Sequence, residues 1–274
     1  MSFAIKSFFV LGLSFFCALN IRAGENGTNY FRELLGHQYN SIGDVEKELK
    51  ELNNYFLSHK MHQAYFNSIY TIVTNGIRTQ IDSGDFERPD CIGKMVVSFS
   101  KMYRDALFSY YFGQKNDTPM AWQQAFIAND STRAKPTVQI MLGMNAHIIH
   151  DLSETVDQVA KADFSCNLEL VHDDYFKLNQ FFDHIIEILN DDLYKTYSLL
   201  QADKNKLNLK PIKVEMVKIM VHEMRSKAWD FANLLSESRD NGEYSDNLLL
   251  IEKESGSNAQ ATLAMSFLFP RNGL

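Results

Sequence analysis

The stretch from Leu142 to Leu152 constrains the fold more than any other part of this chain. It reads Leu-Gly-Met-Asn-Ala-His-Ile-Ile-His-Asp-Leu, which is apolar enough for a buried helix and yet contains an amide, two imidazoles and a carboxylate. Residues three and four apart share a helix face, so His147 and Asp151 lie one turn apart with His150 beside them. The fold must therefore enclose a polar cluster, which can be a metal or proton site or a hydrogen-bonded network of the core.

Helical periodicity along the rest of the chain predicts an all-α fold. Ser41, with Asp44 three residues later, has the pattern that caps the first turn of a helix. No stretch alternates apolar and polar residues strongly enough to predict a strand. We therefore expect a single domain of about six or seven helices packed around a central buried helix, Thr137 to Leu152. The other expected helices begin after Ser41, span roughly residues 61–81, 89–113, 170–200 and 213–235, and include a short one around Trp122 and Phe126.

The N-terminal residues 1–23 have the composition of a signal peptide. Lys6 precedes a run rich in Phe, Leu, Val and Ala, and Ala23 is a small residue suited to cleavage. The run is too short to span a membrane comfortably, and no later stretch is long enough. We therefore expect an exported protein, periplasmic or secreted, without a transmembrane segment. Its expected parts are a flexible lead-in at 24–40, a helical domain at 41–236 and a partly docked C-terminal tail at 237–274.

The charge balance of the chain restricts its partners. The sequence has 27 basic and 34 acidic residues. Removal of residues 1–23 takes away Lys6, Arg22 and no acidic residue, so 25 basic residues remain and the net charge is −9 with neutral histidines. A nucleic acid backbone is therefore not expected as the main partner, whereas a small-molecule or lipid-like substrate is compatible with this charge.

Two cysteines, Cys91 and Cys166, lie outside the expected signal peptide. In an oxidising compartment they can form one disulfide. Two separate buried thiols are an equally good interpretation, because the sequence gives no distance between them.

Two later helices also place polar groups on apolar faces. Residues 172–175 read His-Asp-Asp-Tyr, and Asn179 follows one turn later. Residues 222–225 read His-Glu-Met-Arg, and Trp229 follows one turn later. Three helices that each combine His with Asp or Arg exceed what packing requires, which favours a common site. For Arg225 the simpler interpretation is an ion pair with a carboxylate such as Asp174 or Asp151.

The order of these segments resembles an uncharacterised bacterial family of α-helical domains of unknown function. The resemblance covers about residues 65–229 and implies no particular reaction. The residues that carry it are Trp122 with Phe126, the Gly-Met-Asn-Ala-His segment at 143–147 with Asp151 and Leu152, the segment 172–175 with Asn179, and Arg225 with Trp229. The spacing of His147 and Asp151 is also similar to a ligand pair in the zinc-dependent phospholipase C and single-strand nuclease superfamily, and this similarity implies a zinc cluster bound by several helices.

Our first hypothesis is a metal-dependent hydrolase that acts on an ester or phosphoester. His147, Asp151 and His172 would bind a divalent metal, with zinc as the first expectation, and the metal would activate water. Asp173 or Asp174 would act as the base, and Arg225 would neutralise charge on the substrate. The residues expected to contact the ligand are Asn145, Trp122, Tyr175, Asn179, His222 and Trp229.

The rival hypothesis is a non-catalytic helical binding domain. The His, Asp and Asn cluster would then be a structural hydrogen-bond network, or would orient an apolar ligand. Under this hypothesis the side chains that line the cavity are Tyr70, Tyr103, Trp122 and Trp229. The two hypotheses differ in geometry, because only the first requires His147, Asp151, His172 and Asp174 to converge at the floor of a pocket.

Overall fold

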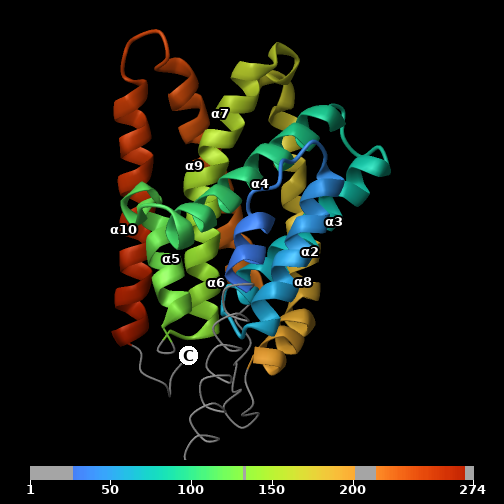
Figure 1. Ribbon diagram of the computed structural model, residues 1–274. Helices are drawn as coiled ribbons and strands as arrows, with labels where there is room; N and C mark the ends of the chain where they lie inside the picture. Colours follow the sequence, from blue (N-terminus) through green and yellow to red (C-terminus); the bar gives the residue numbers. More distant parts are fainter. Residues whose placement is uncertain (1–26, 132–133, 201–213, 269–274) are drawn as a thin grey trace, which may run out of the picture. The chain divides into compact units, whose positions relative to one another are not determined.

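A computed structural model of the chain describes residues 27–131, 134–200 and 214–268 (Figure 1). The chain divides into two units, Met1–Gln38 and Tyr39–Leu274. In the first unit, residues 27–34 of the expected lead-in are helical. In the second, the described residues form helices and no strand, which confirms the all-α prediction.

The helices of the second unit follow the periodicity of the sequence closely. Ser41 caps the first of them as expected, because its side-chain oxygen accepts a hydrogen bond from the Asp44 backbone N–H at 3.2 Å. The α-helices are α2 (Ile42–Ser58), α3 (Ala64–Asp82), α4 (Pro89–Phe112), α5 (Met120–Asp130), α6 (Pro136–Asn145), α7 (Leu152–Ala162), α8 (Leu168–Leu200), α9 (Val214–Glu237) and α10 (Tyr244–Leu268), with short 3₁₀ turns η1 (Lys115–Asp117) and η3 (Phe164–Cys166).

The central helix is longer and less regular than the expected span from Thr137 to Leu152. A π-helical segment, η2 (Ala146–Asp151), joins α6 to α7, so the helical path continues to Ala162. π-helical turns are rare and occur frequently at functional sites. This segment holds both histidines and the aspartate of the central stretch, and it packs against α4, α5, α9 and α10 as well as its own flanking helices.

Within the expected C-terminal tail, residues 244–268 form the helix α10, which lies beside α5 and also packs on α6 and η2 (Figure 1). Its buried face is built from Ile251, Ser255 and Ala259, which follow one another at four-residue spacing. Small residues let the helices approach closely: a Cβ at Gly256 would collide with Met120 on α5. Because this face has little apolar surface, hydrophobic periodicity alone does not reveal the helix.

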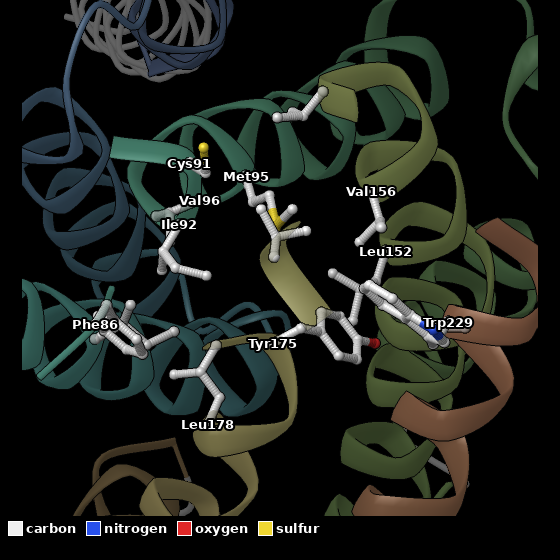
Figure 2. Close-up of a cluster of buried hydrophobic side chains, with 14 of the residues drawn as sticks. Phe86, Cys91, Ile92, Met95, Val96, Leu152, Val156, Tyr175, Leu178 and Trp229 are labelled. Atoms are coloured by element: carbon white, nitrogen blue, oxygen red, sulfur yellow. The ribbon is translucent and has the colours of Figure 1, made fainter. Parts of the chain in front are cut away.

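Cys91 and Cys166 form a disulfide that joins the first turn of α4 to η3, with their Cα atoms 5.4 Å apart. This decides between the two interpretations of the cysteines. The disulfide borders a core cluster that also contains Ile92, Met95 and Trp229 (Figure 2). It therefore cross-links the two ends of the segment that carries α4 to α7.

Within the described parts of the chain, none of the helices is both long enough and apolar enough to cross a membrane. This agrees with the expectation of no transmembrane segment there.

Candidate functional site

Asp151 is the acceptor at the centre of the polar cluster, and it is almost fully buried. Its Oδ2 accepts hydrogen bonds from His147 Nδ1 and Trp122 Nε1, both at 2.9 Å, and its Oδ1 accepts one from His150 Nδ1 at 2.9 Å. Burial alone would raise the pKa of Asp151, but the hydrogen bonds from the two histidines outweigh burial and lower it. Asp151 is therefore an anion that three donors hold in place.

His150 is the cation of the cluster. Its Nε2 lies 3.2 Å from Glu252 Oε2 on α10 and 3.4 Å from Glu154 Oε1 on α7. Burial would lower the pKa of His150, but the bonds to Asp151 and Glu252 raise it to about 10. Glu252 also accepts a hydrogen bond from the Met120 backbone N–H at 2.5 Å, at the start of α5. One imidazolium thus connects η2, α7 and α10. Through Glu252, α10 in turn contacts the N-terminus of α5.

His147 differs from His150 because it is neutral. Burial lowers its pKa, although Asp151 acts in the opposite direction. Since the Asp151 carboxylate can only accept, the His147 proton lies on Nδ1 and Nε2 is left as an acceptor. This Nε2 is buried, and no residue in the described part of the chain is its hydrogen-bond partner. An unsatisfied buried polar atom costs about 1–3 kcal/mol, so the position calls for an explanation.

Aromatic rings enclose the His147 imidazole. We call the group Phe66, Tyr70, Phe99, Tyr103 and Trp122 the aromatic cage. Their ring centroids lie 5.5, 4.4, 3.4, 5.9 and 5.9 Å, respectively, from that of His147. Phe99 stacks face to face on the imidazole, with an angle of 10° between the planes.

The cage depends on a close approach between α3 and α6. A Cβ at Gly143 would lie 2.7 Å from Phe66 Cδ2, so only glycine leaves the Phe66 ring its place. On the other side of the cage, the Tyr70 hydroxyl lies 2.5 Å from Ser100 Oγ. Gly143 therefore has a packing role, whereas the polar residues of the same segment, Asn145 and His147, form hydrogen bonds.

Asn145, expected to contact a ligand, is instead part of the helix packing. Its Nδ2 donates to the Ser255 carbonyl at 2.8 Å, and both residues are buried. This bond ties α6 to α10 beside the Glu252 contact.

The residues of α8 do not join the His147 cluster. Asp174 is buried and accepts hydrogen bonds from the backbone N–H groups of Glu87 and Arg88, at 3.0 and 2.6 Å, just before α4. His172 is exposed and pairs with Asp173 at 2.8 Å. The expected base and the expected third metal ligand therefore have other roles in this fold. The sequence correctly predicts that His172 and Asp174 lie on a helix, but it does not determine which neighbours each side chain meets.

Arg225 is a buried cation, but its partners are neutral. Its Nε donates to Asn179 Oδ1 at 2.8 Å and its Nη2 to the Tyr175 carbonyl at 2.5 Å. Its guanidinium lies over the rings of Tyr175 and Phe182, at 4.3 and 4.9 Å. The simpler interpretation, an ion pair with Asp174 or Asp151, is therefore wrong.

The other predicted site residues of α9, His222 and Trp229, also contact α8. His222 pairs with Asp183 at 3.0 Å near the surface. Trp229 lies 4.8 Å from the Tyr175 ring and belongs to the core cluster of Figure 2. Trp229 is thus apart from the cage, so the four aromatic residues expected to line one cavity do not lie together.

Taken together, the structure assembles His147, Asp151 and Trp122, and it leaves His172, Asp173, Asp174 and Arg225 elsewhere. Among the residues that the structure describes, no group of three or more His, Cys, Asp or Glu side chains is arranged to hold a metal ion. The expected set of His147, Asp151 and His172 is accordingly not formed. The two atoms that face each other, His147 Nδ1 and Asp151 Oδ2, are joined by a hydrogen bond.

Three residues of the site were not expected from the sequence. Glu154 follows His150 by four residues and could have been found by helical spacing. Phe99 has the spacing of an apolar-face residue on its helix, and this spacing does not reveal that its ring stacks on His147. Glu252 has no local signal, because its partner lies far away in the sequence.

A family model described as a family of unknown function, DUF5995, matches residues 42–265, which is most of the chain. No curated protein and no solved structure matches the chain. The similarity to the zinc-dependent phospholipase C and nuclease superfamily thus has no support in these comparisons. The matched residues include all the helices that build the His147 cluster, and the chain belongs to DUF5995, a family of unknown function.

Proposed function

We propose that this domain is a binding domain, and that it holds a small, largely apolar molecule in its interior. His147 is the polar group that orients this molecule, through a hydrogen bond from the ligand to Nε2. The observation that carries the proposal is the His147 Nε2 inside the aromatic cage, which is buried and has no hydrogen-bond partner among the residues that the structure describes.

The proposal rests on how Asp151 constrains His147. By accepting the Nδ1 proton, Asp151 fixes both the tautomer and the orientation of the ring. The pKa of His147 is lowered by burial, which keeps the imidazole neutral near pH 7. A preorganised acceptor in apolar surroundings favours a ligand with one hydroxyl or N–H group, because such a ligand satisfies the orphaned nitrogen.

The hydrolase hypothesis is less well supported by the same geometry. The proposed base Asp174 is saturated by backbone donors, and Asp173 is exposed beside His172. In the described ranges of the chain, the carboxylate bonded to His147 is that of Asp151, which three donors occupy. Among the described residues the metal-binding set that this hypothesis requires is not formed, whereas the buried His147 acceptor is present.

The test compares three probes that differ in one property each: phenol, cyclohexanol and toluene. Phenol and cyclohexanol each supply a hydroxyl donor, whereas toluene does not. We expect both alcohols to raise the unfolding temperature and to shift the Nε2 resonance of His147, and toluene to do neither at equal concentration. The variant His147→Phe keeps a flat ring but has no acceptor, so it should lose the preference for alcohols over toluene.

Two results would overturn the binding proposal. One is the absence of any shift in the His147 resonance with either alcohol. The other is one equivalent of zinc, manganese or iron in protein purified without chelators, because such a metal would restore the hydrolase hypothesis.

We also propose that the protein is exported. The support is the composition of residues 1–23 together with the disulfide between Cys91 and Cys166. Expression of the full chain should yield a secreted or periplasmic product that begins at Gly24. A cytosolic product that keeps Met1 and in which Cys91 and Cys166 are both free thiols would contradict this.

A further inference from the structure

We propose that the C-terminal end of α5 is a calcium site, whose ligands are side-chain oxygens of Gln63, Asn129, Asp130 and Gln139. The site does not involve His147, so it is independent of the proposed function. It also differs in kind from a cluster of His, Cys, Asp or Glu side chains, because three of its four ligands are amides.

Three buried amide oxygens near the end of α5 lack a hydrogen-bond donor among the described residues. They are Gln63 Oε1, Asn129 Oδ1 and Gln139 Oε1. The exposed fractions of these residues are 1%, 7% and 1%, respectively. A buried acceptor without a donor destabilises the fold, and native structures contain few such atoms. Three of them at one end of one helix indicate a place that takes up donors or positive charge from outside the chain.

The hydrogen bonds of the two glutamines show that their oxygens lie at the same place. Gln63 Nε2 donates to Asp130 Oδ1 at 2.9 Å, and Gln139 Nε2 donates to the Ala128 carbonyl at 3.1 Å. Gln139 Nε2 also lies 3.2 Å from Nδ1 of His62, the residue before Gln63. In each amide the oxygen is bonded to the same carbon as this nitrogen, so both oxygens lie beside the last turn of α5.

The orientation of both amides is fixed by their neighbours. Exchange of nitrogen and oxygen in Gln63 would place an oxygen against the Asp130 carboxylate. The same exchange in Gln139 would place an oxygen against the carbonyls of Ala128 and Ala134, which lie 3.1 and 3.2 Å from Nε2. The two amide oxygens therefore cannot gain a donor by a flip.

The charge at this end of α5 is negative. The side chains that donate to Asp130 are Gln63, Tyr110 and Tyr111, and all three are neutral. Burial and the Asp130 charge raise the pKa of Tyr110 to about 12. The C-terminal end of a helix favours a cation, and the last turn of α5 contains no basic residue. Asp130 is exposed, so a cation can reach its carboxylate from solvent.

The ligand set favours calcium over other small partners. Calcium takes about six to eight oxygen ligands in flexible geometry, including carboxylates and the carbonyls of Asn and Gln, and water completes its shell. Magnesium demands a near-ideal octahedron and gives up its own water reluctantly. A single water molecule has two protons to donate and no charge, so it does not balance three acceptors and a carboxylate. With one carboxylate the site is weak, and we expect a dissociation constant on the order of 10⁻³ M, as in extracellular modules.

The experiment uses terbium as a luminescent probe of the calcium site in the full chain. Tyr110 and Tyr111 bond to Asp130, so they can sensitise a lanthanide bound beside it. We expect terbium emission on tyrosine excitation, and we expect calcium to displace the ion while magnesium does not. Urea unfolding at constant ionic strength is the second readout. At a calcium concentration ten times the dissociation constant, the unfolding equilibrium constant should fall about tenfold.

Variants of Asn129 separate a calcium ligand from a packing residue. Asn129→Leu removes one of the three oxygens, so it should lose the calcium-dependent gain. Without calcium it should be at least as stable as the parent, because a buried acceptor without a donor is gone. Asn129→Asp keeps the oxygen and adds a charge, so it should bind calcium at least about tenfold more tightly. Asn116→Asp is the matched control, since Asn116 also precedes an aspartate but is exposed on η1, and its calcium affinity should equal that of the parent.

Four results would overturn the calcium site. The first is the absence of any calcium effect on the parent, which would show that water satisfies these oxygens. The second is an equal effect of magnesium. The third is a full calcium-dependent gain in folded Asn129→Leu, with folding checked by circular dichroism. The fourth is an unchanged calcium affinity in Asn129→Asp, which decides the matter if Asn129→Leu does not fold. None of these results bears on the binding proposal for His147.

Discussion

His150 Nε2 on the π-helical segment lies 3.2 Å from Glu252 Oε2 on α10, and this contact joins the centre of the sequence to its C-terminal helix. Glu252 also accepts the first backbone N–H of α5. The helix that has the weakest apolar pattern is thus held by polar bonds to the most buried part of the fold. A buried ion pair adds little net stability because both charges lose their water, and we infer that this pair acts by fixing where α10 docks.

Loss of the Glu252 charge should destabilise the protein. In Glu252→Gln, His150 keeps its positive charge but loses one of its two main partners, and we expect a cost of roughly 2–3 kcal/mol. The estimate is below that for a fully buried pair because the Glu252 side chain is 27% exposed. The measurement is urea unfolding at pH 7. Glu254→Gln is the matched control, since Glu254 on the same helix pairs with Lys227 at the surface and should cost under about 1 kcal/mol. Equal costs for both variants would contradict the assignment.

Stability should fall on the alkaline side because of His150. Its folded-state pKa of about 10 lies above the ordinary value of 6.5. A raised pKa contributes stability that is full below pH 6.5 and is lost as the pH rises toward 10. Urea midpoints measured from pH 6 to pH 10 should therefore decline in the parent and decline much less in His150→Gln. A parallel decline in both proteins would show that other groups are responsible.

The acid side should be governed by the carboxylates around the same histidine. The pKa values of Asp151 and Glu252 are lowered by their hydrogen bonds from the histidines, against the effect of burial. Their contribution is present above about pH 4.5 and is lost as the pH falls through the lowered values. His147, whose pKa is lowered by burial, also loses its contribution below pH 6.5, whereas Glu154, whose pKa burial raises, acts in the opposite direction. We expect acid unfolding below pH 4.5 in the parent. In Glu154→Gln the urea midpoint should fall more steeply between pH 7 and pH 4.5, because the variant lacks the stability that the parent gains when Glu154 is protonated.

Asp174 should be important for stability, and its neighbour Asp173 should not. Asp174→Ala leaves two backbone N–H groups before α4 without their acceptor, at an expected cost of about 2–4 kcal/mol. Asp173 is exposed, and its one bond to a described residue is that with His172, so Asp173→Ala should change the free energy of unfolding by less than about 0.5 kcal/mol. Thermal unfolding of the two variants checks this. A larger loss of stability in Asp173→Ala than in Asp174→Ala would contradict this, and Asp173 would again be a candidate site residue.

Removal of the disulfide should also be costly. Cys91 and Cys166 are separated by 75 positions, and closing a loop of this size in the unfolded chain is worth about 4 kcal/mol in the chain-entropy account. The double variant Cys91→Ala, Cys166→Ala should therefore unfold at a lower urea concentration than the oxidised parent. Reduction of the parent should reproduce the effect, and an unchanged midpoint in both cases would contradict it.

The helices could be predicted because their signals are local. The Ser41 cap, Pro89 at the start of α4 and the apolar stripe of α3 each lie within a few turns of the residues that they determine. The pairing of His147 with Asp151 was accessible for the same reason. The π-helical turn was not, because nothing in the composition of residues 146–151 distinguishes it from an α-helical turn.

The rest of the site depends on which helix faces pack against each other. The pattern of a single sequence does not determine this packing. His172 and Asp174 lie on a helix that was correctly expected, but one faces solvent and the other faces the start of α4. Arg225 stacks on rings instead of meeting a carboxylate. Glu252 was missed because α10 packs through small residues.

The disulfide also makes part of the chain a closed covalent ring, from Cys91 through α4, α5, α6, η2 and α7 to Cys166. Phe99, Trp122, His147 and Asp151 all lie on this ring, whereas Phe66, Tyr70 and Glu252 lie outside it. A single proteolytic cut anywhere within the ring leaves both fragments joined, so Phe99 and His147 stay in one molecule even when the backbone between them is broken. Such a nicked protein runs as one band on a gel until a reductant is added.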